Sequence, residues 1–401
     1  MIGNTFGRFF RVTACGESYG TALLTIVDGV PAGLELTDAM IQEELDKRRP
    51  GQSKLDSPRL ETDRVQIVAG LLEGKTTGAP VGMTVYNVDR QDIHVQQYRA
   101  VKDLIRPGHA EYTFFVKYGE FSDWCGAGRA SGRETVGRVA AGAVAKQVLD
   151  REGIEVIGHV VESRGIKARP LTFEEVKANY RKNHLNCCDL EKAEEMIADI
   201  LKVREAGDTC GGAVEVIARG VPAGLGEQVF DKLRATIAHG LCSIGAVTGI
   251  EFGGGFRAAS MLGSEWNDPP YLDGKGRVRF RTNNAGGMLG GISNGEDLVV
   301  RLAVKPTSTI SKEQDSINMA TMEEAKLAAI TRRDITICPR IYPVAEAMVR
   351  IAILDHLMMV KGLEYFTHID PRFKEMSKTA RERGEVQAIR PSTFRGTRGD
   401  K

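Results

Sequence analysis

Apolar and polar residues follow one another in two stretches of the chain that each predict a strand, a turn and a helix. The first stretch is apolar and β-branched from Leu23 to Val27, and a segment with helical composition and spacing runs from Asp38 to Arg48. The second stretch has a strand from Ala213 to Ala218 and an amphipathic helix from Phe230 to His239. These two units predict a protein that mixes helices and strands.

The turn between strand and helix has the same sequence in both units. Gly-Val-Pro-Ala-Gly-Leu occupies residues 29–34 and returns at residues 220–225. An internal duplication is the economical interpretation of a repeated motif in a repeated context. Two unrelated turns, each punctuated by proline and glycine, are the alternative. We therefore expect a single domain over residues 1–370, with related halves near residues 1–150 and 205–360.

Four further segments complete the predicted core. We expect helices with strongly apolar faces from Glu134 to Leu149 and from Ala345 to Val360, and strands from Ile154 to Glu162 and from Leu298 to Val304. Small residues share the apolar face of the first helix. This face is therefore expected to pack closely against a sheet or another helix.

Two regions are expected outside this core. Residues 173–205 are charged and helical, and they hold Cys187 and Cys188 in a polar break, which favours a peripheral helical insertion. From Pro371 onward there are nine Lys or Arg residues, four Asp or Glu residues and few apolar residues. This composition predicts a basic, mostly solvated tail over residues 371–401.

Charge balance limits the classes of partner. The 401 residues include 54 Lys or Arg and 53 Asp or Glu, a formal charge of +1, which argues against binding of nucleic acid or a membrane surface through bulk charge. An anionic ligand therefore needs a locally basic site. Glycine is in excess, with 45 residues or about 11% against a usual share of about 7%. That excess is expected in a few specific loops.

Cysteine usage and apolar runs indicate the compartment. The seven cysteines form no CxxC pair and show no metal-ligand spacing with histidine, so we expect reduced thiols and no metal site. The N-terminal residues lack the basic and then apolar pattern of a signal peptide, and no apolar run is long enough to cross a bilayer. We expect the protein in the cytoplasm, without a membrane partner.

Glycine-flanked polar residues mark three candidate ligand loops. Residues 16–20, Gly-Glu-Ser-Tyr-Gly, put polar side chains on a tight loop before a strand, although an ordinary turn is an equal alternative. Residues 126–135 contain two arginines and open onto the core helix, where backbone N–H groups and the helix dipole favour phosphate. Residues 283–291 are glycine-rich and would let a flat ligand or another chain approach the backbone closely.

Basic residues and single proton-transfer groups mark four more candidates. Residues 47–54 form a basic run that could clamp phosphate or carboxylate oxygens, or could simply be a solvated helix end. His109 follows Arg106 closely and could shuttle a proton beside an anion, with a surface-turn histidine as the alternative. Residues 305–309 add a cation and three hydroxyls. Asp334 follows two arginines and could orient or deprotonate a partner, or belong to a surface ion cluster.

In this order the loops resemble the chorismate synthase family, from Gly3 to about Leu357. The matching segments are residues 3–5, 10–13, 16–18, 28–31, 48–51, 106–110, 117–119, 133–135, 138–140, 285–287, 290–293, 305–308 and 345–348. The resemblance implies an α+β fold, a β-α-β sandwich of two related halves, assembled as a homotetramer. It also implies elimination of phosphate from 5-enolpyruvylshikimate 3-phosphate to give chorismate, with reduced FMN as a required cofactor and NADPH as a candidate indirect reductant.

The resemblance assigns roles to individual residues. Substrate or NADP would be bound by Arg48, Lys54, Arg106 and Arg133. FMN would be bound by Arg129, Ala130, Ser131, Gly245, Ala246, Gly290, Lys305, Pro306, Thr307, Ser308, Thr309 and Arg332. Catalytic positions, in a proton relay that includes flavin N5, would be Ser18, Tyr19, His109, Ser131 and Asp334.

The chain departs from the family pattern at four places. The family loop reads Gly-Glu-Ser-His-Gly, and Tyr19 stands where that histidine is the proposed acid. A phenol has a reference pKa near 10 against about 6.5 for imidazole, so Tyr19 is a poor proton shuttle near neutrality. Asn284 also replaces a histidine, Ala130 replaces a common serine, and residues 333–336 differ from the usual stretch.

Three functional hypotheses follow. The first is a chorismate synthase in which Tyr19 or water takes over part of the role of the histidine. The second is a paralogue that keeps the flavin or phosphate-ester pocket but has altered or lost catalysis. The third, an RNA-binding protein, is disfavoured by the near-neutral charge, scarce aromatics and absent RNA motifs. We therefore expect a small-molecule substrate and no nucleic-acid partner.

Overall fold

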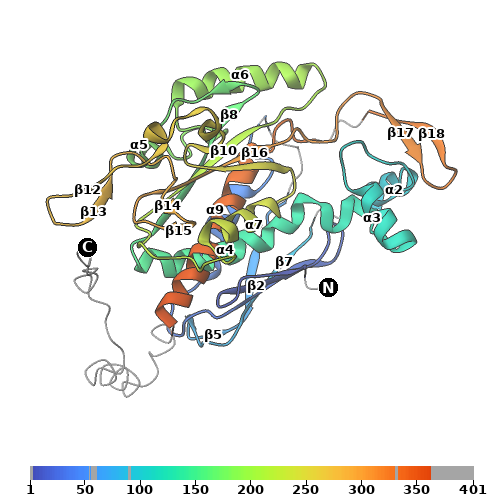
Figure 1. Cartoon of the computed structure of the whole chain (residues 1–401). Coiled ribbons are helices and arrows are strands. Elements are labelled where there is room, and N and C mark those ends of the chain that lie inside the picture. The colour runs from blue at the N-terminus through green and yellow to red at the C-terminus, as the bar shows by residue number, and fades with distance from the viewer. Residues whose placement is uncertain (1–2, 54, 56–60, 89–91, 330–332, 363–401) are drawn as a thin grey trace.

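Two five-stranded antiparallel sheets lie on either side of a layer of helices (Figure 1). The computed structural model describes residues 3–53, 55, 61–88, 92–329 and 333–362. The predicted tail, residues 371–401, lies outside the described residues. The helix layer packs on both sheets, and the buried apolar residues of the three layers form one large cluster. This mixture of helices and sheets agrees with the expected α+β fold.

The first sheet is formed by strands from the N-terminal part of the chain. Its strands, in spatial order, are β1 (Thr5–Phe6), β2 (Arg11–Cys15), β3 (Ala22–Asp28), β7 (Val81–Tyr86) and β4 (Val65–Ala69). The predicted alternation is clear in β3, where Leu23, Thr25 and Val27 are buried while Leu24 and Ile26 are 44% and 49% exposed. The inner face of this sheet therefore contacts the helices, and its outer face carries exposed apolar side chains.

The second sheet is formed by strands from the C-terminal part of the chain. Its strands, in spatial order, are β11 (Val247–Phe252), β16 (Leu298–Val304), β10 (Gly212–Arg219), β8 (Glu155–Ser163) and β9 (Ile166–Lys167). In β16, Leu298, Val300, Leu302 and Val304 are buried. The strands predicted at residues 154–162, 213–218 and 298–304 are thus confirmed to within a residue or two at each end.

The central layer contains α1 (Asp38–Arg48), α4 (Thr135–Arg151), α7 (Leu233–Cys242) and α9 (Cys338–Lys361). Close packing of α4 follows from its small residues, because a Cβ at Gly142 would lie 2.3 Å from the Cβ of Ala347 in α9. Helix α9 begins seven residues earlier than predicted, since Pro339 is tolerated in the first turn of a helix. Helix α7 begins three residues later than predicted.

The predicted insertion contains α5 (Phe173–Asn179) and α6 (Leu190–Glu205), on the outer side of the second sheet (Figure 1). The description of Cys187 and Cys188 as a polar break at the periphery is wrong, because both side chains are fully buried. Asn183 donates to the carbonyl of Cys187 and accepts from its N–H, so the backbone of the break is satisfied internally. The insertion therefore contributes to the core.

The remaining elements project from the layers. Helices α2 (Asp92–Ala100) and α3 (Glu111–Tyr118) lie beside the hairpin of β17 (Gln314–Asn318) and β18 (Glu323–Leu327). The N–H of Ile105 donates to the carbonyl of Ile317 at 3.1 Å, which joins this hairpin to the chain between α2 and α3. Smaller elements are β5 (Leu71–Leu72), β6 (Lys75–Thr76), β12 (Pro270–Leu272), β13 (Val278–Phe280), β14 (Met288–Leu289), β15 (Ile292–Ser293) and α8 (Gly263–Trp266).

The two repeated hexapeptides are held by the same set of hydrogen bonds. Thr76 Oγ1 donates to the carbonyl of Pro31 and accepts from the N–H of Leu34, at 2.5 and 2.9 Å. Ser293 Oγ makes the corresponding bonds to Pro222 and Leu225, at 2.6 and 2.8 Å. Both hydroxyls belong to the second strand of a short hairpin. This correspondence supports the internal duplication, which stays a prediction.

One carboxylate joins the two ends of the domain. Asp355, buried in α9, accepts hydrogen bonds from the backbone N–H groups of Arg8, Phe9 and Phe10, at 2.7 to 3.1 Å. These donors lie in the turn between β1 and β2. The last described helix therefore fixes the first turn of the chain.

None of the helices in the described part of the chain is both long enough and apolar enough to cross a membrane.

Candidate active site

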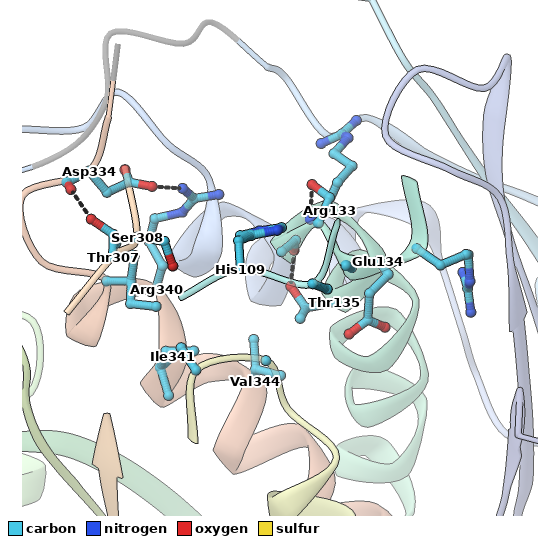
Figure 2. A pocket seen from close by; sticks show the side chains of 18 of the residues that line it. His109, Arg133, Glu134, Thr135, Thr307, Ser308, Asp334, Arg340, Ile341 and Val344 are labelled. Atoms are coloured by element: carbon cyan, nitrogen blue, oxygen red, sulfur yellow. Dashed lines mark hydrogen bonds and ion pairs between the residues drawn. The ribbon is translucent and has the colours of Figure 1, made fainter. Parts of the chain in front are cut away.

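A cavity of about 750 Å³ opens where the first sheet, the N-terminal end of α4 and the N-terminal end of α9 meet the loops after β16 (Figure 2). Its wall includes residues from both halves of the chain, among them segments 106–110, 129–135 and 305–309. Arginine and lysine side chains outnumber the carboxylates on this wall. The cavity is therefore suited to an anionic ligand.

Most of the residues predicted for the site come together in this cavity. The lining residues are Tyr19, Arg48, Arg106, His109, Arg129, Ala130, Ser131, Arg133, Gly245, Ala246, Lys305, Pro306, Thr307, Ser308, Thr309 and Asp334. Ser18 is buried directly behind the wall. Gly290 lies in the turn between β14 and β15 and does not line the cavity. Lys54 and Arg332 lie outside the described residues.

His109 is presented on a turn that is held from two sides. The N–H of His109 donates to the carbonyl of Arg106 at 3.1 Å, and the carbonyl of Gly108 accepts from Lys305 Nζ and Ser308 Oγ, at 2.9 and 2.7 Å. Gly108 has a φ of +70°, which suits glycine at this position. Segments almost 200 residues apart thus fix one histidine inside the cavity (Figure 2).

A second contact holds the ring of this histidine. His109 Nδ1 lies 3.1 Å from Glu111 Oε2, and Arg106 Nε donates to Glu111 Oε1 at 2.9 Å. Burial raises the pKa of Glu111, but His109 and Arg106 outweigh burial and lower this pKa to about 2. Glu111 is therefore an anion that connects two predicted site residues. Glu111 was not predicted to be a site residue.

The guanidinium groups of Arg48 and Arg133 were expected to be open for phosphate, but they are buried and paired with a carboxylate. Both side chains are nearly fully buried, and Asp63 pairs with both of them, through Oδ2 to Arg48 Nη1 at 2.7 Å and through Oδ1 to Arg133. Glu61 lies 3.4 Å from Arg133 Nη2, and Asn87 accepts from Arg133 Nε at 2.8 Å. The alternative of a solvated helix end is wrong for Arg48. These partners were not predicted, because no local pattern marks them.

The loop before α4 turns by means of unusual backbone geometry. Gly126, Ala127 and Gly128 have positive φ values within the 3₁₀ segment Cys125–Ala130, and a second 3₁₀ segment, Gly132–Glu134, precedes the helix. Arg129 then folds back and donates to the carbonyls of Gly16 and Ala14 at 2.9 and 3.1 Å. The predicted loop at residues 126–135 therefore reaches the cavity.

This arrangement also joins two predicted hydroxyls. Ser131 Oγ lies 3.3 Å from Ser18 Oγ and accepts from the N–H of Arg133 at 3.2 Å. A hydroxyl can accept and donate at the same time, so Ser131 donates its O–H to Ser18 while it accepts from that N–H. The buried Ser18 and the cavity-lining Ser131 thus form a hydroxyl pair at the wall.

The ring of Tyr19 forms part of the cavity wall. The ring packs edge-on against Tyr98, with centroids 5.4 Å apart and an interplanar angle of 73°. A Cβ at position 126 would lie 2.5 Å from the Tyr19 ring, so only glycine leaves room for this ring there. The position that departs from the family histidine is therefore in the cavity.

The carboxylate of Asp334 has a partner in α9 that was not predicted. Arg340 Nη1 donates to Asp334 Oδ2 at 2.7 Å, and Thr307 Oγ1 donates to the carbonyl of Asp334 at 2.9 Å (Figure 2). The neighbouring Arg333 instead pairs with Ser311 Oγ and with the carbonyl of Asp208. The local Arg-Arg-Asp sequence gave no sign of the ion pair with Arg340, which lies in the first turn of α9, and Arg332 lies outside the described residues.

Two glycine-rich segments are not part of this cavity. Gly253 and Gly286 pack against each other, since a Cβ at Gly253 would lie 2.4 Å from the N of Gly286. Asn284 donates to the carbonyls of Glu265 and Trp266 at 3.1 Å and belongs to this same packing. Of the four departures from the family pattern, the one at Asn284 thus lies away from the cavity.

The chemistry of the cavity follows from its side chains. It offers guanidinium and ammonium groups for anions, hydroxyls from residues 307–309, and one histidine and one aspartate that can exchange protons. Among the described residues, no cluster of three or more histidine, cysteine or carboxylate side chains could hold a metal ion. The geometry is suited to proton transfer beside a bound anion.

Comparisons with known proteins agree with this geometry. The sequence model described as "Chorismate synthase" matches residues 10–358. The chorismate synthase of Acetivibrio thermocellus is 58% identical over 394 residues, covering 94% of this chain and all of the relative, and that of Methanosarcina barkeri is 51% identical over 358 residues, covering 89% of this chain and 97% of the relative.

The fold is similar as well. A solved structure titled "Crystal Structure of Chorismate Synthase" matches with a TM-score of 0.70 and 29% identity, covering 94% of this chain and 99% of that chain. Residues 10–358, which the sequence model matches, contain the second sheet, four of the five strands of the first sheet, almost all of the helix layer and the described cavity-lining residues from Tyr19 to Val344. A match of this length in sequence and in fold places the chain in the chorismate synthase family.

Proposed function

We propose that this chain converts 5-enolpyruvylshikimate 3-phosphate to chorismate by anti-1,4-elimination of phosphate, as a carbon–oxygen lyase of the shikimate pathway. The observation that supports this proposal is the single cavity in which His109, Ser131 and Asp334 lie among arginines and lysine 305. A small, highly charged substrate fits such a wall. Relatives named chorismate synthase at up to 58% identity support the same reaction.

The family implies a flavin cofactor, and the donor set of the cavity fits reduced FMN. Arg129, Ser131 and the 305–309 segment supply donors for a phosphate and for ring heteroatoms. Ala246, with a φ of +70°, accepts from the N–H of Lys305 through its carbonyl and orders this wall. When bound, reduced FMN would supply transient electron donation to the substrate as phosphate departs, without net oxidation.

The reducing equivalents for the flavin come from outside the chain in this proposal. NADPH is the proposed indirect reductant, acting through a separate reductase. The assignment of Gly290, Lys54 and Arg332 to cofactor or substrate binding stays a prediction.

Substrate anions are held by the basic wall. Arg106 and Lys305 line the cavity beside His109 and serve the phosphate and carboxylates of the substrate. Arg48 and Arg133 contribute positive potential, but their guanidinium groups are engaged by Asp63 and its neighbours. Direct contact of either arginine with substrate therefore requires exchange of a buried ion pair.

The reaction removes a proton from the substrate ring, and residues of the cavity must accept it. The ring C–H bond and the C–O bond to phosphate break, a ring double bond forms, phosphate leaves with the C–O electron pair, and the ring proton passes to a base. Asp334 and His109 are the proposed proton-transfer groups, with the Ser18–Ser131 pair as a hydrogen-bonded relay. Tyr19 can donate a hydrogen bond where the family has a histidine, but it transfers protons poorly near neutral pH.

The proposed assembly is a homotetramer in the cytoplasm, without nucleic-acid or membrane partners. Exposed apolar residues support an oligomer, because Leu24 and Ile26 on the first sheet and Phe115 and Val116 on α3 lie at the surface of the single chain. Sedimentation velocity of the purified protein tests this assembly. A monomer at micromolar concentration contradicts it.

An anaerobic assay tests the reaction. Purified protein, photoreduced FMN and 5-enolpyruvylshikimate 3-phosphate are mixed, and chorismate and inorganic phosphate are measured together. Equal amounts of both products support the proposal, and a control with oxidised FMN should release neither. Absence of phosphate release, with tight FMN and substrate binding by titration, would favour a paralogue with lost catalysis. Tyr19, in place of the family histidine, is the observation that favours this alternative.

A further inference from the structure

A carboxylate joins the two residues of the cavity wall that carry the proposed phosphate contact and the proposed proton transfer. Glu111 opens helix α3, where an acidic side chain is favoured in the first turn. One of its oxygens, Oε1, accepts from Arg106 Nε at 2.9 Å and also from Arg106 Nη2. The other, Oε2, lies 3.1 Å from His109 Nδ1. Its two oxygens are therefore divided between two functional side chains.

The three side chains form one unit with limited solvent access. The exposed fractions of Arg106, His109 and Glu111 are 19%, 23% and 22%. The turn from Arg106 to His109 is fixed independently by Lys305 and Ser308, which bind the carbonyl of Gly108. Since the backbone of the turn is already held, the remaining freedom of His109 is rotation of its ring. The contact with Glu111 Oε2 removes that freedom.

The direction of the hydrogen bond follows from the charge of Glu111. An ionised carboxylate has lone pairs but no proton, so it only accepts. Arg106 favours this ionised form, because a guanidinium only donates and is always charged. His109 must then donate through Nδ1–H. A neutral ring with its proton on Nδ1 has an unprotonated Nε2, which is the atom left to accept or return a proton.

We propose that Glu111 is a positioning residue that fixes His109 as the Nδ1–H tautomer and so assigns proton transfer in the cavity to His109 Nε2. This inference rests on the proposed function only where it says that His109 Nε2 transfers a proton. The tautomer itself is a property of the protein without substrate. Nuclear magnetic resonance of the free protein therefore tests it separately from turnover.

The substitution Glu111→Gln gives the sharpest test. The amide has one oxygen and one NH₂ group, and Arg106 can only donate, so the amide oxygen faces Arg106 and the NH₂ group faces His109. His109 Nδ1 then becomes the acceptor, and the proton moves to Nε2. Glu111→Asp keeps an acceptor-only group and retains the original tautomer. Glu120→Gln, an exposed glutamate in the segment after α3, is the matched control for loss of one negative charge.

The experiment uses ¹⁵N-histidine-labelled protein, and the pH is raised until the ring ¹⁵N shifts no longer change, so that the tautomer is read on the alkaline plateau. His109→Ala identifies the signal, and the ¹⁵N shifts report which ring nitrogen carries the proton. We expect Nδ1–H in wild type, in Glu111→Asp and in Glu120→Gln, and Nε2–H in Glu111→Gln. Wild type with Nε2–H overturns the proposal, and so does Glu111→Gln with an unchanged tautomer.

Turnover measurements complete the test. Reversal of a histidine tautomer in a serine protease triad costs about 10⁴-fold in kcat, and a positioned acid or base contributes about 10²- to 10⁴-fold. We expect Glu111→Gln to lose 10²-fold or more in kcat, Glu111→Asp to recover most of that loss, and Glu120→Gln to match wild type. A reversed tautomer with unchanged kcat overturns the assignment of transfer to Nε2. Inactive wild type with the expected tautomer overturns the proposed function and not the tautomer.

Discussion

The ring of Tyr19 packs edge-on against the ring of Tyr98, with 5.4 Å between centroids, on the wall of the cavity. The ring of Tyr19 also packs against Gly126, where any Cβ would overlap the ring. The residue that departs from the family histidine is thus held in place by aromatic packing. Its chemistry can be altered while its position is kept.

Restoring an imidazole at this position is expected to raise turnover. Tyr19→His replaces a phenol of reference pKa near 10 by a group near 6.5, which can donate and recover a proton at neutral pH. We expect kcat to rise by about 10-fold or more, within the range of a positioned acid. Anaerobic single-turnover kinetics with reduced FMN measures this. The control, Tyr98→Phe, keeps the edge-on contact, and a Tyr19→His rate at or below that of wild type would contradict the prediction.

The buried carboxylate between Arg48 and Arg133 is expected to be a major determinant of stability. Asp63→Asn leaves two buried guanidinium groups without their shared anion, and removal of one partner of a buried pair costs about 3–5 kcal/mol. Urea unfolding followed by circular dichroism gives the free energy of unfolding. Asp315→Asn, on an exposed strand, is the control and should leave the free energy of unfolding nearly unchanged.

The same residue predicts a pH dependence of stability. Burial raises the pKa of Asp63, but attraction by Arg48 and Arg133 outweighs burial and holds this pKa below its usual range. Because the unfolded chain takes up the proton first as the pH falls, the stabilisation is full above the unfolded pKa of about 3.9 and is lost through the lower folded pKa. The difference in urea midpoint between wild type and Asp63→Asn should therefore shrink below about pH 4. A difference that stays constant down to about pH 2 is inconsistent with this linkage.

Close packing between α4 and α9 predicts a steric effect. Gly142→Ala puts a methyl group 2.3 Å from the Cβ of Ala347, and overpacking of a dense core costs about 1–3 kcal/mol. Thermal unfolding should show a lower Tm for this variant. At Gly263 nothing lies within 4 Å of an added Cβ, so Gly263→Ala is the matched control and should keep the Tm of wild type.

Lys305 is expected to connect cofactor binding with the position of His109. Lys305→Met removes a cation from the wall and the bond to the carbonyl of Gly108. Hydrogen bonds to charged groups contribute about 1.5–3 kcal/mol, which corresponds to roughly 10- to 100-fold weaker FMN binding. Quenching of flavin fluorescence measures the Kd. Lys326→Met, on the exposed β17–β18 hairpin, should bind FMN as wild type does, and equal affinities for both variants would exclude Lys305 from the flavin site.

The sequence was informative where a pattern is local. Strand β3 and helix α1 follow from periodicity within a few residues, and the loops at residues 106–110 and 126–135 are marked by glycine beside charge. Asp63 gave no such signal, because its partners lie 15 and 70 residues away along the chain. Arg340 was missed as a partner of Asp334 for a different reason, because the helix whose first turn contains Arg340 was predicted to begin only at residue 345.

Burial was the second source of error. Cys187 and Cys188 lie in a polar stretch of sequence, yet their side chains are packed in the apolar clusters, and Asn183 satisfies the backbone of Cys187 there. Composition reports the average polarity of a segment and not the face that each residue presents. The same limit applies to Arg48, whose charge suggested a solvated helix end.

The contact between Asp355 and the turn at Arg8 to Phe10 has a consequence for the order of folding during synthesis. The first turn of the chain receives its anchor only when residue 355 has been made, and α9 also packs on the second sheet and on α4. A nascent chain that stops before Cys338 therefore leaves the apolar inner faces of β8 and β10, and the face of α4 that packs on α9, uncovered. Contacts of such large sequence separation form slowly, so the protein should complete its fold only after translation of α9 and should depend on protection from aggregation until then.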